Sequence, residues 1–375
     1  MPRPLVLLVA IATLAIAGCG GSSKTTSSAS RSTATASTAA FIAPLKTIKT
    51  VASTVPGNGD INPYGLQVVP SSVGKLVAGS LLVSNFNAKS NNQGTGTTID
   101  QISPAGKSSL FAGIDPQSLP GSCPGGVGLT TALSVLPGGY VIVGSLPSTN
   151  GMSATAKAGC LIVLDSNGHP VSTIAGGQIQ GPWDMTSVSH GSTTTLFVSM
   201  VLNGGAKQGV HTDKNSTVLR INLRSGPGQA PKVLSERVIA NKIPWIDSPE
   251  ALVIGPTGVA LASDGTLYLA DTLENRITAI PQAMTRTTPV KGGRTTVSQG
   301  GHLKQPLGLA LTPGGNILTT NAGDGNMVET TPAGKQVAVR TADTKTGAGS
   351  LFGLVVKEGS VYYVDDGENT LRLLH

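Results

Sequence analysis

Apolar and polar positions alternate along Thr257–Ile280 with a period of two, which is typical of a β-strand with one buried face. The first apolar run covers residues 259–261 and the second covers residues 267–269. A polar turn at residues 263–265 separates the two runs, and a third run begins at Arg276. Turns of this kind connect antiparallel strands. The stretch therefore predicts three short antiparallel strands.

This unit recurs along the chain. The six predicted inner strands begin near Asn62, Val127, Gly181, Thr257, Gln305 and Phe352. Outer, fourth strands are predicted at Ser108–Ala112, Val171–Ala175, Val233–Ile239 and Gln336–Val339. The chain holds 49 Gly and 24 Pro and only 12% charged residues, and we find no run with helical apolar spacing after the first 19 residues. Together these features predict an all-β protein.

The sixth copy ends at His375 after only three strands. An alternating run at Leu45–Ala52 precedes the first copy and supplies a candidate for the missing strand. If this run pairs with the last copy, the ring closes and no inner strand edge is left unpaired. We therefore expect a single domain over Phe41–His375, a six-bladed β-propeller of four-stranded antiparallel blades in which an N-terminal strand completes the last blade.

The repeat at Thr257–Ile280 resembles an NHL repeat, one blade of a β-propeller. Six-bladed proteins with distant similarity include gluconolactonases and streptogramin lyases. The resemblance implies the propeller fold, and in the metal-dependent relatives it implies carboxylate, amide or imidazole side chains that converge on the central channel. The resemblance to extracellular NHL sensor domains also implies a role in signalling or in interactions within the cell envelope. A fold of this kind does not define a reaction.

Residues 1–19 have the character of a targeting segment. Arg3 is followed by an apolar run, Leu5–Ala17, that is short for a membrane span. The run ends in Ile16-Ala17-Gly18-Cys19, which resembles the lipobox of bacterial lipoproteins. The resemblance implies cleavage before Cys19 and lipid attachment to this residue, so that the protein is anchored in the membrane and faces outside the cytoplasm. The alternative is an ordinary secretory signal with a chance cysteine.

Residues 20–40 are almost entirely Gly, Ser, Thr and Ala, so we expect a flexible tether.

Cys123 and Cys160 remain once Cys19 carries lipid, and in an oxidising compartment they predict one disulfide. The net charge of +7 is spread along the chain without a basic cluster, which disfavours nucleic-acid binding. We expect a monomer with no cofactor.

Three long polar connections are predicted between second and third strands, at Asn85–Thr97, Ser145–Gly159 and Met200–Thr217. In a propeller these connections lie on the same face as the links between blades. Long loops on a rigid scaffold are frequently functional. They make this face the candidate ligand face.

Two sets of residues are expected near this face. The positions beside the inner-strand glycines form an apolar and aromatic ring of Tyr64, Val127, Trp183, Thr257, Leu307 and Phe352. The ends of the second strands form a ring of Asn85, Ser145, Met200, Asp271, Asn321 and Asp365. The aromatic residues either anchor a ligand or plug the channel as core. The Asp and Asn residues are expected to cap turns, with chemistry as the alternative.

None of the five histidines has a spacing that suggests a metal site, and no phosphate loop or nucleophile elbow is present. We therefore expect no metal, and we regard the protein as a binding or scaffold module for a protein, glycan or small molecule. The candidate ligand residues are Tyr64, Trp183, Asp184, His211, Asp271, Asn321, Phe352 and Asp365. The alternative is a lactonase-like hydrolase or lyase that uses Asp184, Asp271 or Asp365 with His211. No catalytic residue is assigned.

Overall fold

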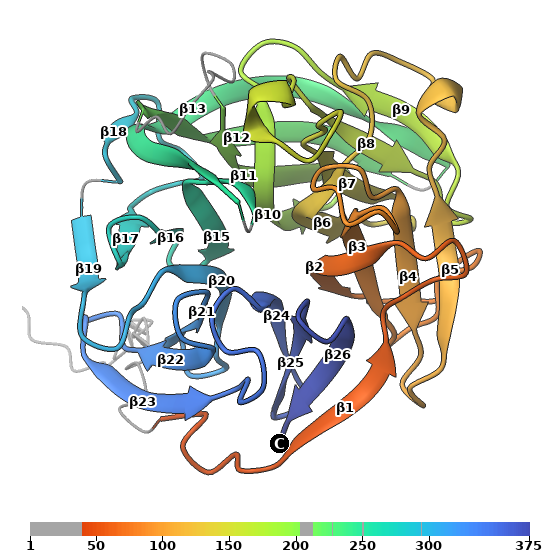
Figure 1. Ribbon diagram of the computed structural model, residues 1–375. Helices are drawn as coiled ribbons and strands as arrows, with labels where there is room; N and C mark the ends of the chain where they lie inside the picture. Colours follow the sequence, from red (N-terminus) through yellow and green to blue (C-terminus); the bar gives the residue numbers. More distant parts are fainter. Residues whose placement is uncertain (1–39, 203–212, 227, 250, 294) are drawn as a thin grey trace, which may run out of the picture. The chain divides into compact units, whose positions relative to one another are not determined.

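The computed structural model describes residues 40–375 except 203–212, 227, 250 and 294. These residues belong to one compact unit, in which six antiparallel sheets are arranged around a central axis (Figure 1). The only helices in the described residues are two short 3-10 turns, η1 (Pro116–Ser118) and η2 (Ser153–Thr155). Neither is long enough to cross a membrane. The predicted six-bladed propeller is confirmed.

Each blade has an inner, a second, a third and an outer strand. The inner strands are β2 (Ile61–Val68), β6 (Leu129–Val135), β10 (Gly181–His190), β15 (Pro256–Leu261), β20 (Pro306–Leu311) and β24 (Leu351–Lys357). The second strands are β3 (Leu81–Asn87), β7 (Val141–Ser145), β11 (Thr193–Val201), β16 (Leu267–Asp271), β21 (Ile317–Asn321) and β25 (Ser360–Asp365).

The third strands are β4 (Thr98–Ile102), β8 (Cys160–Leu164), β12 (Asp213–Gly226), β17 (Arg276–Ile280), β22 (Asn326–Thr330) and β26 (Thr370–Leu374). The outer strands are β5 (Ser108–Gly113), β9 (Pro170–Ile174), β13 (Gln229–Ser248), β19 (Thr295–Gln299), β23 (Gln336–Thr341) and β1 (Ile48–Ser53). Blade 3 carries two additional short strands, β14 (Leu252–Ile254) and β18 (Val290–Lys291), which pair with β13.

The ring is closed by the N-terminal strand, as predicted. β1 pairs antiparallel with β26, so the outer strand of the last blade comes from the other end of the domain. The residues before β1 are also fixed: the Glu329 carboxylate accepts the N–H groups of Phe41 and Ile42, both at 2.9 Å. Glu329 is fully buried, and this charged pairing holds the entry of the chain against blade 5.

The two faces of the propeller differ in their connections. We call the face with the second-to-third connections and the links between blades the loop face. We call the opposite face, with the first-to-second and third-to-fourth hairpins, the hairpin face. Each inner strand therefore begins at the loop face and ends at the hairpin face.

Blade 2 differs from the predicted alignment. Leu129 lies opposite Ser145, as Pro63 lies opposite Asn85 in blade 1, and β6 contains one more bulged residue than the other inner strands. The ring position of this blade is therefore Thr130 and not Val127, which packs between blades 1 and 2. In most other blades a glycine follows the ring position, and Gly128 matches this pattern. The sequence therefore predicted Val127 as the ring position of blade 2.

Near the bulges of the inner strands, hydroxyl groups from three second strands join neighbouring blades. Ser199 Oγ accepts the N–H of Asp184 (3.1 Å) and donates to the Thr257 carbonyl of the next blade (2.7 Å). Ser84 and Thr320 make the same pair of bonds in blades 1 and 5. The inner strands are thereby fixed relative to one another, which gives the channel a defined wall.

Candidate functional site

An aromatic cluster closes the channel. Tyr64 stacks on Phe352 with ring centroids 3.8 Å apart and on Phe86 at 4.5 Å, and Trp183 lies tilted against Tyr64 at 5.9 Å. All four rings are buried. The structure therefore places the predicted aromatic ligand residues in the core, where they separate a cavity on the hairpin side from two depressions on the loop side.

The hairpin-side cavity is the channel itself, about 330 Å³ in volume and lined by the second halves of the inner strands. Asp184 is the only ionisable residue among its described lining residues, which are otherwise mainly aliphatic. Its Oδ1 accepts the Met185 N–H (2.9 Å) and its Oδ2 accepts the Val259 N–H of the next blade (3.2 Å). Burial raises the pKa of the Asp184 carboxyl to about 7, in opposition to these two hydrogen bonds.

Asp184 replaces a glycine of the repeat. In blade 5 the corresponding Gly308 lies so close to the Phe352 carbonyl that an added Cβ would stand 2.2 Å from it, and Gly353 approaches the Tyr64 carbonyl in the same way. Blade 3 instead leaves room for a carboxylate that bridges to the next inner strand. A departure from a repeat at one position, next to a cavity, indicates a candidate functional group.

Two depressions share the loop face. The first has a volume of about 540 Å³ and the second about 390 Å³, and both are lined by Pro249, Ala348 and Gly349. The first is polar, and its lining is Ile61, Asn62, Asn87, Asn91, Asn92, Gln93, Asn150, Gly151, Asp366, Gly367 and Asn369 together with the shared residues. The second is more apolar and contains Ile254, Leu307 and Phe352. The predicted long connections of blades 1 and 2 therefore meet at one site, facing blade 6.

The polar depression presents side-chain amide oxygens without partners. Among the described residues, Asn62 Oδ1, Asn87 Oδ1 and Gln93 Oε1 are buried and accept no hydrogen bond. Asn62 and Asn87 are 7% and 1% exposed. Buried polar atoms of native proteins nearly always have a partner, so a group of unpartnered ones around a cavity indicates a ligand or ordered water.

Local structure explains the position of these amides. Asn62 has a left-handed backbone with φ of 66°, and Asn369 Oδ1 accepts its N–H at 2.7 Å. Asn275 holds Gln305 at the entry of blade 5 in the same way. Asn87 ends β3 and donates from Nδ2 to Asn91 Oδ1 (2.8 Å). Asparagine suits these places because it tolerates the left-handed region and bonds the local backbone.

Asp366 of blade 6 lines the same depression. Burial and the neighbouring Asp365 carboxylate raise the pKa of Asp366 well above its usual range. Hydrogen bonds from Ser350, Thr346 and backbone N–H groups outweigh burial and lower the pKa of Asp343. Asp343 therefore keeps its negative charge down to a lower pH than an exposed carboxyl, while Asp366, which lines the depression, remains protonated at a higher pH.

The predicted Asp and Asn ring at the ends of the second strands is fully buried and engaged locally. Asp271 forms an ion pair with Arg276 at 2.7 Å, and Asp365 pairs with Arg372 at 3.0 Å. Burial raises the pKa of Asp365 to about 6 despite this pairing. Asn321 donates to the His302 carbonyl (2.7 Å) and to Asp324 (3.0 Å). None of the three lines a cavity described above.

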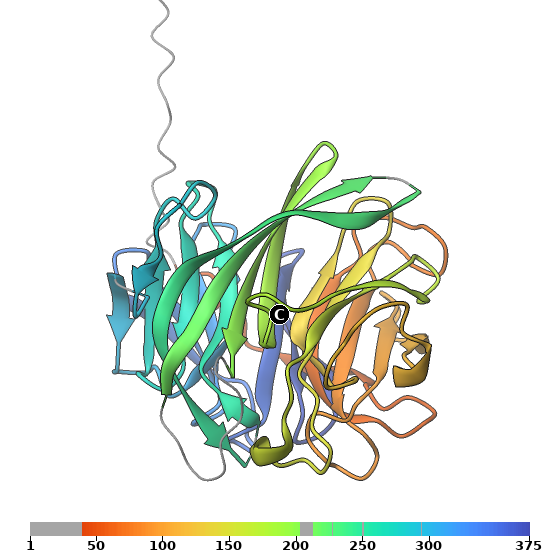
Figure 2. The same ribbon diagram turned by 90° about the horizontal axis from the view of Figure 1, so that it is seen from above.

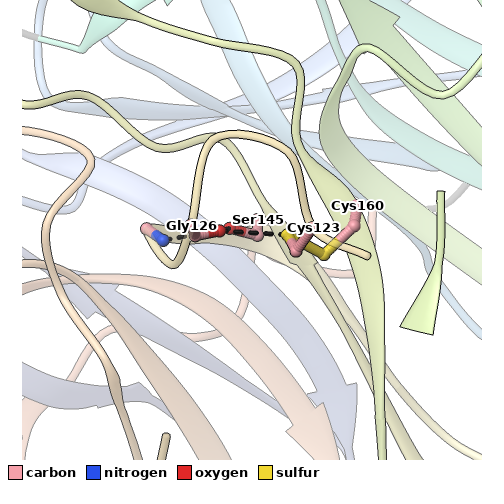
Figure 3. The surroundings of a disulfide bond; sticks show 5 residues. Cys123, Gly126, Ser145 and Cys160 are labelled. Atoms are coloured by element: carbon pink, nitrogen blue, oxygen red, sulfur yellow. Dashed lines mark hydrogen bonds between the residues drawn. A yellow bond between two sulfur atoms is a disulfide. The ribbon is translucent and has the colours of Figure 1, made fainter. Parts of the chain in front are cut away.

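Cys123 and Cys160 form the predicted disulfide, with Cα atoms 5.2 Å apart (Figure 3). Cys160 lies opposite Ser145 in the β7–β8 ladder. Ser145 Oγ donates to the Gly126 carbonyl (2.9 Å) and accepts the Gly128 N–H (3.0 Å). The disulfide and this serine together fix the base of the blade 2 connection that borders the polar depression.

The remaining candidates lie elsewhere. Cys19 and His211 are outside the described residues. Within residues 40–375, leaving aside the undescribed positions, no three His, Cys, Asp or Glu side chains are grouped closely enough to hold a metal ion. Sequence reasoning did not single out Asn62, Asn87 or Asp366, although the polar composition of Asn85–Thr97 was a signal for the first depression.

No protein-family model and no curated protein matches this chain. Solved structures do match. Virginiamycin B lyase from Staphylococcus aureus aligns with a TM-score of 0.52 and 13% identity over 88% of this chain and 99% of its own, and a catalytically inactive variant of it with quinupristin matches equally. A gluconolactonase from Xanthomonas campestris aligns with a TM-score of 0.54 and 13% identity over 87% of this chain and 88% of its own. At these identities the likeness establishes the fold.

Proposed function

We propose that this chain is an envelope binding protein, anchored outside the cytoplasm through lipid on Cys19, whose loop face holds a neutral ligand rich in hydroxyl or amide groups. The observation that carries the proposal is the pair of unpartnered, buried amide oxygens of Asn62 and Asn87 in one cavity. An unsatisfied buried acceptor costs about 1–3 kcal/mol, which a donor on a ligand recovers.

The neighbouring depression refines the ligand class. Its apolar surface includes the half-buried Ile246 and Leu273 and adjoins the amide-lined part. A sugar ring offers hydroxyl groups along its edge and C–H groups on its faces, so an oligosaccharide contacts both parts at once. We therefore favour a glycan over a charged small molecule.

Binding to an array of neutral envelope oligosaccharides tests this function. We expect Asn87→Leu, which keeps the volume and removes the amide, to weaken binding at least about tenfold, equivalent to about 1.4 kcal/mol. The matched control is Asn167→Leu in an exposed turn on the hairpin face. Binding that is unchanged by Asn87→Leu would place the ligand outside this depression.

A lactonase-like hydrolase or lyase is the second candidate. It is supported by the Asp184 carboxyl, whose pKa of about 7 suits a general base, beside the channel cavity. The lyase and lactonase folds of the structural neighbours agree with it. Turnover of lactones, esters or quinupristin, lost in Asp184→Asn or on addition of a chelator, would favour this candidate. No turnover with or without divalent cations would leave the binding function.

A further inference from the structure

The blade 3 hairpin formed by β12 and β13 is much longer than its counterparts. The two strands have 14 and 20 residues, whereas the third and outer strands of the other blades have five or six. Figure 2 shows this hairpin, in green, slanting across the hairpin face beside the β10–β11 hairpin, which stands highest. The propeller fold does not require this extension, since the other five blades close without it.

The blade 3 hairpin carries facing like charges and exposed apolar side chains, both of which are unfavourable in water. Arg224 and Lys232 lie directly opposite each other in the ladder, and both are exposed. Like charges in this arrangement destabilise a strand pair. The next two residues, Val233 and Leu234, are 43% and 51% exposed. An anionic and partly apolar partner would relieve both features.

Blade 1 presents a similar element on the same face. In the β2–β3 connection, Lys75 lies between Val73 and Val77, which are 37% and 48% exposed. The Lys75 N–H donates to the Ser166 carbonyl of blade 2 (2.9 Å). This contact holds the element against one side of blade 2. The blade 3 hairpin contacts the other side, where Glu236 accepts the Gln178 N–H (3.0 Å).

Charge is distributed unequally between the two faces. The hairpin face carries further exposed lysines at Lys46, Lys107 and Lys335. Its described acidic residues include Asp165, Asp264, Glu358, Glu236 and the buried Glu329. Asp165 lies 3.5 Å from His169, and Glu358 lies 2.8 Å from Lys357. Acidic residues of the loop face include Glu274, Asp324, Asp343, Asp365, Asp366 and Glu368. The loop face also carries exposed lysines such as Lys89 and Lys304, but it has more acidic residues than the hairpin face, which is therefore the more basic of the two.

The chain also enters the propeller at the hairpin face. Glu329, which accepts the N–H groups of Phe41 and Ile42, is bonded at 2.7 Å by Asn316 from the β20–β21 turn of that face. Lys46 donates its N–H to the carbonyl of His375 at the end of β26 (3.1 Å). A membrane anchor N-terminal to Phe41 would bring this face toward the bilayer.

We propose that the hairpin face docks directly on an anionic phospholipid bilayer through Arg224, Lys232, Val233 and Leu234 of blade 3 and Val73, Lys75 and Val77 of blade 1. Basic side chains bind the anionic headgroups, and the exposed apolar side chains enter the interfacial region. The loop face then points away from the membrane. The contact does not require the lipid on Cys19 or a ligand on the loop face.

Vesicle co-sedimentation tests the proposal with residues 36–375, which lack Cys19 and form the compact, closed unit described above. We expect binding to phosphatidylglycerol–phosphatidylcholine vesicles, no binding to phosphatidylcholine alone, and release by salt. Arg224→Glu/Lys232→Glu should weaken binding at least tenfold, and Val233→Ser/Leu234→Ser at least threefold. The matched control, Lys89→Glu/Lys304→Glu on the loop face, changes the net charge equally and should leave binding within twofold.

Three results would overturn the proposal: no binding to anionic vesicles, equal binding to neutral vesicles, or equal losses in the two charge-reversed variants. The last result would assign the affinity to the net charge of +7 and not to this face. Thermal unfolding of each variant confirms that it is folded, and Arg224→Gln/Lys232→Gln replaces the reversed pair if that pair does not fold. Glycan binding is measured separately, so failure of one proposal leaves the other unaffected.

Discussion

At the scale of single residues, position 184 differs from the repeat: most other blades have glycine at this position, and blade 3 has an aspartate beside the channel cavity. Glycine satisfies the close approach of neighbouring inner strands in blades 5 and 6, whereas Asp184 spans a wider gap by accepting the Val259 N–H. The sequence predicted Asp184 as a candidate because it is an acidic residue next to the predicted channel ring. Its environment, an aliphatic channel wall, comes from inner strands that lie far apart in the chain.

Asp184 should make the stability of the protein depend on pH. Its pKa is about 7 in the folded state and 3.8 in the unfolded chain, so between pH 4 and 7 the folded state holds a proton that the unfolded chain releases. The free energy of unfolding therefore falls as the pH rises through this range. We expect Asp184→Asn to reduce the difference between pH 5 and pH 8 by about 2–3 kcal/mol, measured by urea unfolding.

The control for this prediction is Asp264→Asn, which neutralises a carboxyl in an exposed turn. It should leave the pH dependence of the wild type in place, because Asp184 is retained. An Asp184→Asn profile parallel to that of the wild type would show that another carboxyl, such as that of Asp100, whose pKa burial also raises to about 7, dominates the titration.

The aromatic cluster should behave as core. Phe352 is 1% exposed and stacks on Tyr64, so Phe352→Ala removes a buried ring from the channel and leaves a cavity. We expect a loss of about 3–5 kcal/mol in the free energy of unfolding, measured by chemical denaturation. Met152→Ala, at a side chain that is 62% exposed, should cost less than about 0.5 kcal/mol. A small loss for Phe352→Ala would show that the ring contributes little to packing.

At the scale of elements, the alternating apolar positions and the polar turns between them were sufficient to predict the blades, because each blade consists of short antiparallel strands joined by turns. They were insufficient in two places. The predicted ring position of blade 2, Val127, lies three positions before the observed one, Thr130, because the extra residue in the β6 bulge changes the register without changing the composition. The predicted outer strand Val233–Ile239 lies within β13, which extends over 20 residues because its polar ends pair with β12 and β14.

The blade 2 disulfide should contribute strongly to stability. Cys123 and Cys160 are separated by 37 positions, and closing a loop of this size in the unfolded chain corresponds to about 4 kcal/mol in the chain-entropy model. We expect dithiothreitol to lower the thermal midpoint of the wild type. The Cys123→Ser/Cys160→Ser variant should have a lowered midpoint that dithiothreitol does not change. Equal midpoints for the oxidised wild type and this variant would contradict the prediction.

At the scale of the whole molecule, the fold determines on which face the charged residues lie and which distant residues form the loop-face site. The sequence suggested scattered charge, but the arrangement of strands places more acidic residues, such as Asp343 and Asp366, on the loop face than on the hairpin face, which carries Lys75 and Lys232. The loop-face site likewise combines Asn62, Asn87 and residues of blade 6, whose proximity depends on ring closure. These relations could not be predicted before the path of the chain around the ring was known.

Ring closure itself gives the last prediction. A chain that begins at residue 54 lacks β1 and the Phe41 and Ile42 N–H donors to the buried Glu329 carboxylate, so β26 becomes an unpaired edge. We expect this truncation to lower the urea midpoint and to form dimers or aggregates in size-exclusion chromatography, whereas a chain that begins at residue 36 retains wild-type behaviour. A synthetic peptide of residues 41–54 should restore the midpoint when added in excess, because it supplies the same strand in trans, and a scrambled peptide should not. If the truncated chain unfolds at the wild-type midpoint, closure by β1 contributes little, and stability comes from packing between adjacent blades.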